Sequence, residues 1–156
     1  VSAACAHAMT NVFAPADRTP TPGVQRTPAV LRLDDGTIFE GVSIGYNGGA
    51  KGCVVFNTAM VGFPEALTNP EQKGLIVVTT WASWVTFTVK TPEKDNLGLV
   101  AGFESEYVAA EAVIIPVVTI DPDHQQAPEG HRTVLQWFQE NKLPAITGLN
   151  TRALVK

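Results

Sequence analysis

Long hydrophobic runs are absent from this sequence of 156 residues, in which no stretch of about 18 consecutive apolar residues occurs. We therefore expect no membrane-spanning helix. Charge is also sparse, since 17% of the residues are charged against 45% that are hydrophobic, and the formal net charge is −4. An acidic chain without clustered Lys and Arg lacks the electrostatic attraction to phosphate backbones, so we expect no nucleic-acid partner.

Cysteine is scarce as well, because Cys5 and Cys53 are the 2 that the chain contains. Two cysteines are too few for a disulfide framework, and they are typical of a protein from a reducing compartment. Cys5 lies in a stretch whose composition predicts disorder. We therefore expect no structural disulfide between the two residues.

The length allows one domain with a sizeable core, and the N-terminal part of the chain differs from the rest. Residues 1–28 are rich in Ala, Thr and Pro without a sustained hydrophobic period, which predicts a disordered extension before a domain at 29–156. Arg18 and Arg26 stand against a lone acid, Asp17, so a transit-peptide remnant is the alternative for this extension. The sequence does not begin with Met, and we expect a fragment or a processed product.

The stretch Val54–Pro70, VVFNTAMVGFPEALTNP, predicts a strand, a tight corner and a short helix in succession. Its first residues, Val54–Phe56, are apolar and largely β-branched, which favours a buried strand. Gly62 interrupts the apolar run, and Pro64 suits the first turn of a helix because that turn needs no N–H donor. The helix is expected to end before Pro70, since the residue preceding a proline avoids helical geometry.

Four further segments carry clear secondary-structure patterns. Residues 34–36, Asp-Asp-Gly between apolar runs, predict a β-hairpin, because its turn needs a positive φ. Residues 75–80, LIVVTT, predict a buried strand. In the segment 112–119, AVIIPVVT, Pro116 predicts that the strand lies at a sheet edge or ends there. Apolar residues at helical spacing predict an amphipathic helix after Thr133, a candidate N-cap.

These segments resemble, in one colinear order, the N-terminal domain of the small (glutaminase) subunit of carbamoyl-phosphate synthetase. Residues 52–70 are similar to the family pattern G-E-V-V-F-N-T-x-M-x-G-Y-x-E-x-L-T-D-P. The family's F-E-S recurs at residues 103–105, and residues 143–152 resemble I-P-x-I-x-G-V-D-T-R, with Asn150 in place of the family's Asp. The resemblance covers about residues 29–156.

The resemblance implies an α/β fold, the three-layer β/β/α swivelling-type domain of mixed sheets with a few helices. It also implies a non-catalytic role in glutamine-dependent carbamoyl-phosphate synthetase. There the domain docks the glutaminase domain on the synthetase and helps to shape the ammonia route. The enzyme is a ligase that makes carbamoyl phosphate from glutamine, bicarbonate and ATP, for pyrimidine or arginine biosynthesis.

Partners and cofactors are likewise implied by the resemblance. The expected partners are the chain's own glutaminase domain, which would follow Lys156, and the large subunit or region of the synthetase. ATP and Mg are expected cofactors of the parent enzyme. We expect residues 1–156 themselves to bind neither. The expected compartment is the cytoplasm, or the mitochondrion if the N-terminal extension is a transit-peptide remnant.

One substrate-facing position can be carried over from the family. The residue after T-D-P is commonly a serine that reaches the glutamine held in the neighbouring domain, and here this residue is Glu71. A carboxylate differs from a hydroxyl because it only accepts hydrogen bonds at neutral pH. It would either meet the substrate's α-ammonium group or repel its carboxylate.

An aromatic segment departs from the family. Where the family has T-Y-P-x-I-G-N-Y-G, residues 80–87 read TWASWVTF. Trp81, Trp84 and Phe87 are core aromatics or candidates for a protein interface, where Trp is favoured.

The sequence contains no complete catalytic constellation. A glutaminase of this type places its cysteine nucleophile on a strand–turn–helix elbow beside a histidine, whereas Cys53 leads into a strand and stands where the family has Glu. We therefore expect the chain alone to hydrolyse no glutamine. His124 and His131 lie near acidic residues, but their spacing matches no closed metal site, and we expect no metal.

Two other classes of function stay open at this point. One is a stand-alone protein-binding module that kept the fold without the enzyme, which Glu71 and the altered segment 80–87 favour. The other is a small cysteine hydrolase that uses Cys53 as its nucleophile.

Overall fold

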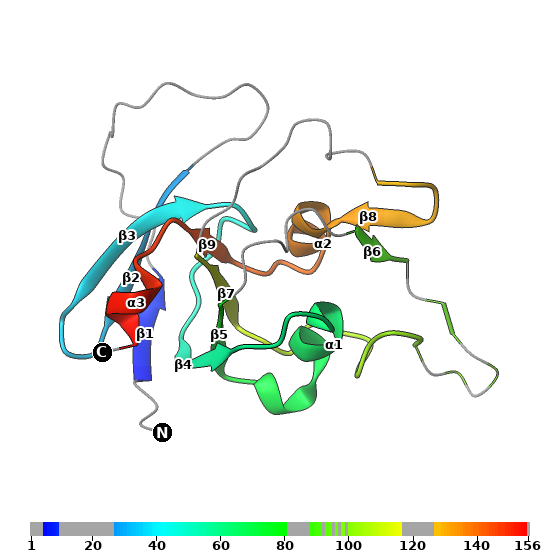
Figure 1. Ribbon diagram of the computed structural model, residues 1–156, viewed down its shortest axis with the longest axis horizontal. Helices are drawn as coiled ribbons and strands as arrows, with labels where there is room; N and C mark the ends of the chain where they lie inside the picture. The colour runs from blue at the N-terminus through cyan, green and yellow to red at the C-terminus, as the bar shows by residue number, and fades with distance from the viewer. Residues whose placement is uncertain are drawn as a thin grey trace.

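The computed structural model describes residues 5–9, 27–80, 88–91, 93, 94, 96, 98, 100–116 and 127–155, and for residues 5–9 it describes the backbone alone. Among these residues, no helix has the length and apolarity that a membrane crossing requires. A large mixed sheet, a two-stranded sheet and short helices make up the described part of the chain (Figure 1). The prediction of an α/β domain of mixed sheets with a few helices is confirmed.

The strands of the large sheet close on themselves as a barrel, in the order β1-β2-β3-β9-β7-β5-β4. Their bounds are β1 Cys5–Met9, β2 Thr27–Leu33, β3 Ile38–Ser43, β4 Gly52–Asn57, β5 Leu75–Thr79, β7 Ala112–Ile115 and β9 Ala145–Thr147. The neighbours β4, β5, β7 and β9 run parallel, whereas β1, β2 and β3 pair antiparallel. Closure gives each of these strands two neighbours and so leaves none of them as an exposed edge.

The hairpin between β2 and β3 forms where the Asp-Asp-Gly signal predicts it. Gly36 has a φ of 87°, and the Leu33 N–H donates to the carbonyl oxygen of Thr37 over 2.9 Å. The Asp35 carboxylate accepts the Thr37 N–H at 2.7 Å. Hydrogen bonds from the side chain and backbone of Thr37 hold the pKa of Asp35 below its usual value.

Alternate residues of the parallel strands belong to two different hydrophobic clusters. On one face, side chains such as Ile76, Val78 and Ile114 join residues of β2, β9 and α3 in a cluster that we call the barrel cluster. On the other face, Val77 and Val113 pack with residues of α1 and α2 in what we call the helix cluster. Because both faces are covered, these strands read as continuous apolar runs in the sequence.

The remaining elements surround this barrel. They are α1 Phe63–Thr68, a 3-10 turn η1 Pro70–Gln72, α2 Val134–Glu140, α3 Thr151–Leu154 and the strands β6 Thr88–Lys90 and β8 His131–Thr133. The ladder of β6 and β8 lies on the side of the molecule away from the β2–β3 hairpin (Figure 1). The helix predicted after Thr133 is confirmed, since α2 begins at the next residue.

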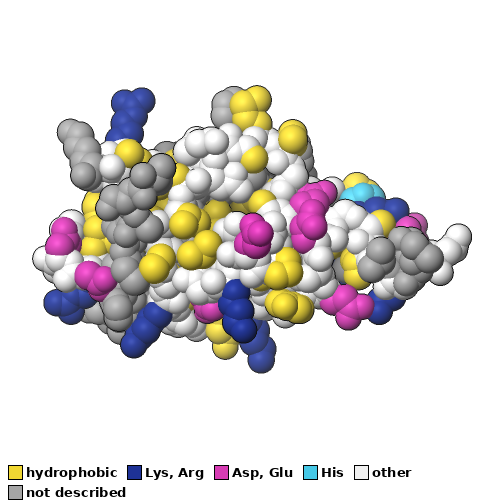
Figure 2. Space-filling model, turned by 90° about the horizontal axis from the view of Figure 1, so that it is seen from below, with side chains coloured by type: hydrophobic (Ala, Val, Ile, Leu, Met, Phe, Trp, Pro, Cys, Tyr) yellow, Lys and Arg dark blue, Asp and Glu magenta, His cyan; other side chains and the backbone are white. Residues whose placement is uncertain are grey.

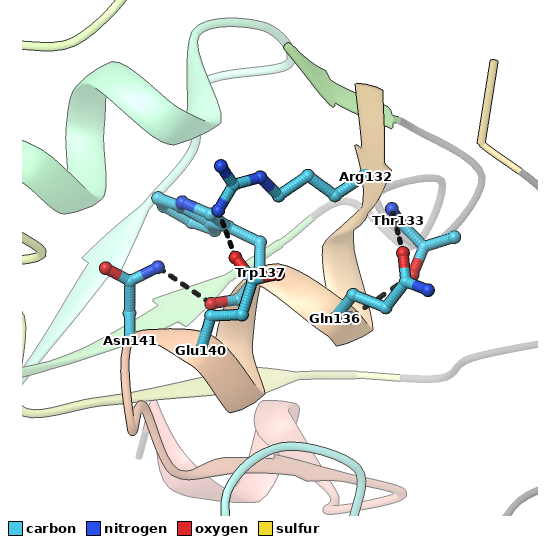
Figure 3. A network of polar contacts seen from close by, with 6 residues as sticks. All are labelled: Arg132, Thr133, Gln136, Trp137, Glu140 and Asn141. Carbon is cyan, nitrogen blue, oxygen red and sulfur yellow. Dashed lines mark hydrogen bonds and ion pairs between the residues drawn. The ribbon is translucent and has the colours of Figure 1, made fainter. Parts of the chain in front are cut away.

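Helix α2 begins with a capping box (Figure 3). The Thr133 hydroxyl accepts the Gln136 N–H at 3.2 Å, and the Gln136 side chain accepts the Thr133 N–H at 3.0 Å. Arg132 pairs with Glu140 across the helix, and the Asn141 amide donates to the Trp137 carbonyl at 2.8 Å. Both ends of this short helix thus have side-chain partners for backbone groups that would otherwise be unsatisfied.

Strand β1 lies within the stretch that the sequence predicts to be disordered. Residues Cys5–Met9 pair antiparallel with both β2 and β4, which the sequence pattern of this stretch does not indicate. The strand signal is hidden because CAHAM is short and rich in Ala, which has little intrinsic preference for strands. The boundary between extension and domain at residue 28 stays a prediction.

Pro116 ends a central strand. Strand β7 stops at Ile115, directly before the proline, and it is paired on one side with β5 and on the other with β9. Of the two alternatives that the sequence leaves open, termination is therefore the one that holds. The N–H that proline lacks is not needed, because the ladder has ended there.

Phe138 provides a test of the helix cluster. Its side chain is fully buried, and its ring centroid lies 5.9 Å from that of Phe63 and 6.0 Å from that of Trp137. We expect Phe138→Ala to lower the free energy of unfolding by about 3–5 kcal/mol, because it leaves a cavity between α2 and the sheet. Urea denaturation would measure this, with the exposed Tyr107→Ala as the control, expected to change stability by less than about 0.5 kcal/mol. Equal losses in the two variants would contradict this account of the core.

Candidate functional site

The candidate site lies where the parallel strands β4 and β5 end. Asn57 closes β4, and its side-chain oxygen accepts the Ala59 N–H at 2.8 Å. The Asn57 carbonyl also accepts the Thr80 N–H at 3.2 Å, which holds the ends of β4 and β5 together. Carboxyl ends of parallel strands are the edge at which α/β proteins usually place their functional loops.

Gly62 makes the turn from this loop into α1. Its φ of 76° and ψ of 35° are left-handed, a conformation that glycine adopts without steric cost. Pro64 occupies the first turn of the helix as predicted, and the Ala66 N–H donates to the Gly62 carbonyl at 2.9 Å. The corner therefore delivers Phe63 into the helix cluster while Met60 and Val61 stay outside.

Thr68 is the residue that fixes the far end of α1. Its hydroxyl donates to the Pro64 carbonyl at 2.7 Å and accepts the Glu104 N–H at 3.0 Å. The Ser105 hydroxyl donates to the Thr68 carbonyl at 2.6 Å. The Phe-Glu-Ser motif, which the sequence presents only as a family marker, thus holds α1 and the following turn in place.

Glu71 lies in the turn η1, directly after this braced helix. Asn69 caps η1, because its side-chain oxygen accepts the Glu71 N–H at 2.9 Å, and the Lys73 N–H donates to the Pro70 carbonyl at 3.2 Å. The Glu71 side chain is exposed. Its backbone is therefore held by local hydrogen bonds, while its carboxylate is presented to solvent and to any neighbouring domain.

A shallow apolar hollow lies beside α1. Its volume is about 120 Å³, and it is lined by Met60, Val61, Gly62, Phe63, Pro64, Thr88, Val89 and Val134. Val61 is 79% exposed and Met60 is 59% exposed, so two large apolar side chains stand in water at its rim. The exposed pair Met60 and Val61, which we call the apolar rim, is of the kind that marks protein contact sites.

Charges of both signs are mixed over the face seen in Figure 2, where hydrophobic side chains lie between acidic and basic ones. One ion pair on the surface joins Lys94 to Glu106 at 2.5 Å. The hydrogen bond from Lys94 and its positive charge lower the pKa of Glu106 below its usual value.

Of the other residues singled out in the sequence, those that the structure describes belong to separate strands. Trp81, Trp84 and Phe87 lie outside the described residues, as does His124. Cys53 is a residue of β4 and not of a strand–turn–helix elbow, and His131 opens β8 with an exposed side chain. Within the described ranges, no group of three or more His, Cys, Asp or Glu residues is arranged to hold a metal ion.

Sequence reasoning did not foresee the apolar rim. Met60 and Val61 follow a strand of apolar residues, and they read as a continuation of its core-facing pattern until Gly62 interrupts it. The available signal is their position in the loop between the end of β4 and Gly62, since connecting loops run over the protein surface. Phe56 was likewise expected to be buried, but it is 40% exposed.

Comparison with known proteins shows which family this chain is similar to. The family profile described as "Carbamoyl-phosphate synthase small chain, CPSase domain" matches residues 31–156. The chain is 37% identical over 131 residues to the carbamoyl phosphate synthase small chain of Sulfolobus acidocaldarius, an alignment that covers 83% of this chain and 34% of that protein.

Two further relatives differ in the share of their own length that this chain matches. The arginine-specific small chain of carbamoyl phosphate synthase from Aspergillus clavatus is 37% identical over 134 residues, which is 84% of this chain and 29% of that protein. The multifunctional protein CAD of Squalus acanthias is 38% identical over 128 residues, 82% of this chain and 6% of that protein. The chain thus spans about a third or less of the length of these relatives.

The hydroxyl of Thr68 can be tested by Thr68→Val, which keeps the shape of the side chain. We expect a loss of about 1–3 kcal/mol in the free energy of unfolding, because the Glu104 N–H and the Pro64 carbonyl both lose a hydrogen-bond partner. The matched control is Thr91→Val at an exposed threonine, expected to change stability by less than about 0.5 kcal/mol in urea titrations. A Thr68→Val variant as stable as its control would show that the hydroxyl does not brace α1.

Proposed function

Since the chain belongs to the family of carbamoyl-phosphate synthase small chains, we propose that it is the N-terminal, non-catalytic domain of a glutamine-dependent carbamoyl-phosphate synthase. The observation that carries this proposal is the match of the small-chain CPSase domain to residues 31–156, most of the chain. The braced corner of α1, with the family residues Thr68 and Ser105 bonded to each other, supports it.

The reaction in this proposal divides between domains. Glutamine hydrolysis supplies ammonia, which travels through the protein to bicarbonate activated by ATP, and the product is carbamoyl phosphate for pyrimidine or arginine synthesis. Ammonia that becomes protonated is no longer a nucleophile, so its route must exclude water. The present domain contributes to that exclusion by packing against the catalytic parts.

In this proposal the cofactors bind to other parts of the enzyme and not to this domain. The glycine-rich loop at 45–52 lacks the Gly-Lys-Ser/Thr ending of a phosphate-binding loop, and its glycines serve close packing. A Cβ added to Gly52 would lie 2.4 Å from the Gly74 carbonyl oxygen, for example. In this proposal ATP and Mg therefore bind to the large chain, and the enzyme works in the cytoplasm or, with a transit-peptide remnant at its N-terminus, in mitochondria.

The apolar rim is the surface that we assign to docking of the glutaminase domain. Its apolar side chains border a hollow beside α1, and α1 leads directly into η1 and Glu71. Glu71, the position that the family resemblance assigns to glutamine, follows at the other end of α1. Association with the large chain follows from the same family relation.

Val61→Asp tests this assignment in the full-length polypeptide assembled with its large chain. We expect glutamine-dependent synthesis of carbamoyl phosphate to fall about tenfold, because burying a carboxylate at an apolar contact weakens docking. Synthesis with ammonium chloride in place of glutamine should stay unchanged. The matched control is Val155→Asp, since Val155 is also exposed, at 65%, but lies at the end of α3.

Retention of glutamine-dependent synthesis in Val61→Asp would overturn the docking assignment, while the family proposal would stand. Equal loss in the two Asp variants would mean that the effect is not specific to the apolar rim. Failure of the wild-type assembly to use glutamine at all would overturn the proposed function itself.

A second candidate is a stand-alone protein-binding module, which the exposed Glu71 in place of the family's serine favours. The size of the native polypeptide separates the two functions. An antibody against this domain should detect, in an extract of the source cells, a band far larger than 16.6 kDa, because the proposed enzyme carries its glutaminase on the same polypeptide. A band near 16.6 kDa would exclude the enzyme and leave the binding module.

A further inference from the structure

A second, more polar hollow lies between α2 and the segment 103–108. Its volume is about 160 Å³, and it shares no lining residue with the hollow beside the apolar rim. Its lining combines polar and apolar side chains, among them Arg132, Trp137, Asn141, Glu106, Phe103 and Val108. Figure 3 shows the Arg132 side chain extended alongside the Trp137 ring, with Asn141 on the same side of α2. A hollow of this size admits a molecule of a few heavy atoms and not a drug-sized ligand.

The indole N–H of Trp137 has no hydrogen-bond acceptor among the described residues. Trp137 is only 3% exposed, because its ring packs against three phenylalanines, Phe63, Phe103 and Phe138. A buried indole N–H usually has an acceptor. The Thr147 hydroxyl is the one side-chain group, within the described ranges, that is both enclosed and unpartnered. The indole N–H is therefore not enclosed by protein, and we place it at the hollow that Trp137 lines.

Arg132 brings further N–H donors to the same hollow. Its pair with Glu140 uses Nη1, and no acceptor for Nε or Nη2 lies among the residues that the structure describes. Arg132 is half-buried and Glu140 is exposed, and an ion pair in such a setting contributes little to stability. An incoming anion can therefore replace Glu140 at the guanidinium without a large loss.

These donors match a carboxylate. Its oxygens only accept hydrogen bonds, and the hollow offers them the Trp137 indole, the Arg132 guanidinium and the second N–H of Asn141, whose first N–H donates to the Trp137 carbonyl at 2.8 Å. Glu140 shows that Arg132 pairs with this type of group. We propose that the hollow binds the carboxylate of a short-chain organic acid, with Arg132 and the Trp137 indole as its donors.

The other lining residues fit a small acid of this kind. Phe103 and Val108 are half-buried and form an apolar wall against which a short carbon chain can lie. Glu106 also lines the hollow, but its charge is compensated by Lys94 at 2.5 Å. The edge of the hollow carries the exposed Glu106 and Asn141, whereas the centre of a protein–protein contact is depleted of charge. This favours a free acid over an acidic side chain of another protein.

The ligand would connect two parts of the fold. It would contact α2 and the segment 103–108, whose Ser105 hydroxyl donates to the Thr68 carbonyl at the end of α1. A ligand that binds only the folded chain stabilises it by mass action. Binding here needs no residue of the apolar rim, so the site is separate from the proposed docking surface.

Titration of the ¹⁵N-labelled chain of 156 residues with butyrate tests the site. NMR follows the indole N–H signals, and Trp81→Phe and Trp84→Phe identify the two that do not belong to Trp137. We expect the Trp137 signal to move downfield with a dissociation constant of about 1–10 mM, as for other ligands of a few atoms. Butyramide, the neutral control, should bind at least about tenfold more weakly. Formate, which lacks the carbon chain, should bind about fivefold more weakly.

Three variants separate this site from a purely structural ion pair. Arg132→Gln should weaken butyrate binding at least about tenfold, because the charge-assisted hydrogen bonds are lost. Glu140→Gln should tighten it about threefold, because the chain's own competing carboxylate is removed. The matched control is Arg152→Gln, an exposed arginine of α3, which should leave the dissociation constant unchanged.

A Trp137 signal that stays in place at about 50 mM butyrate would overturn the proposal. Equal binding of butyrate, formate and inorganic phosphate would do so too, since it would mean a general attraction of anions without the apolar wall. If Arg132→Gln does not fold, Glu140→Gln decides, because butyrate binding that is unchanged or weaker in this variant contradicts competition at Arg132.

Discussion

Burial of the parallel strands β5 and β7 on both faces is the constraint on which the rest of the structure depends. The apolar side chains of these strands point to both faces of the sheet, so both faces must be covered. Ile76, Val77, Val113 and Ile114 are accordingly almost completely inaccessible to solvent. One face is covered when the sheet closes around the barrel cluster, and the other when α1 and α2 pack on the helix cluster. The helices are short, so packing against the sheet stabilises them more than their intrinsic propensity does.

This constraint also determines where a functional surface can lie. Helix α1 must pack on the sheet through Phe63 and Leu67, and its entry corner at Gly62 then leaves Met60 and Val61 outside. The bonds of Thr68 to the 104–105 segment keep the helix from shifting along the sheet. A surface that is apolar but firmly positioned suits docking of a neighbouring domain, since little conformational entropy is lost on contact.

Much of the fold can be predicted from local signals in the sequence. The β2–β3 hairpin, the corner before α1, and the capped start of α2 at Thr133 each follow from a few adjacent residues with specific backbone requirements. Closure of the barrel cannot be predicted in this way, because β1 pairs with residues distant in sequence and its own composition is weak. The apolar rim escapes prediction for a related reason, since exposure of Val61 depends on the direction of a turn and not on side-chain type.

The departures of this chain from the family pattern separate its scaffold from its surface. Asn150 replaces an aspartate, yet its side-chain oxygen still accepts the Ala153 N–H at 3.1 Å, so the cap of α3 is kept while the charge is lost. Glu71, at the position where the family resemblance implies a serine, lies in a turn whose geometry depends on the Asn69 cap and on backbone bonds. The cap of α3 and the turn η1 both form with these residues, and the side chain that the turn presents to solvent at position 71 is a carboxylate. The hydrogen bonds that hold the turn join the Asn69 side chain and backbone groups, so the side chain at position 71 can change without loss of these bonds.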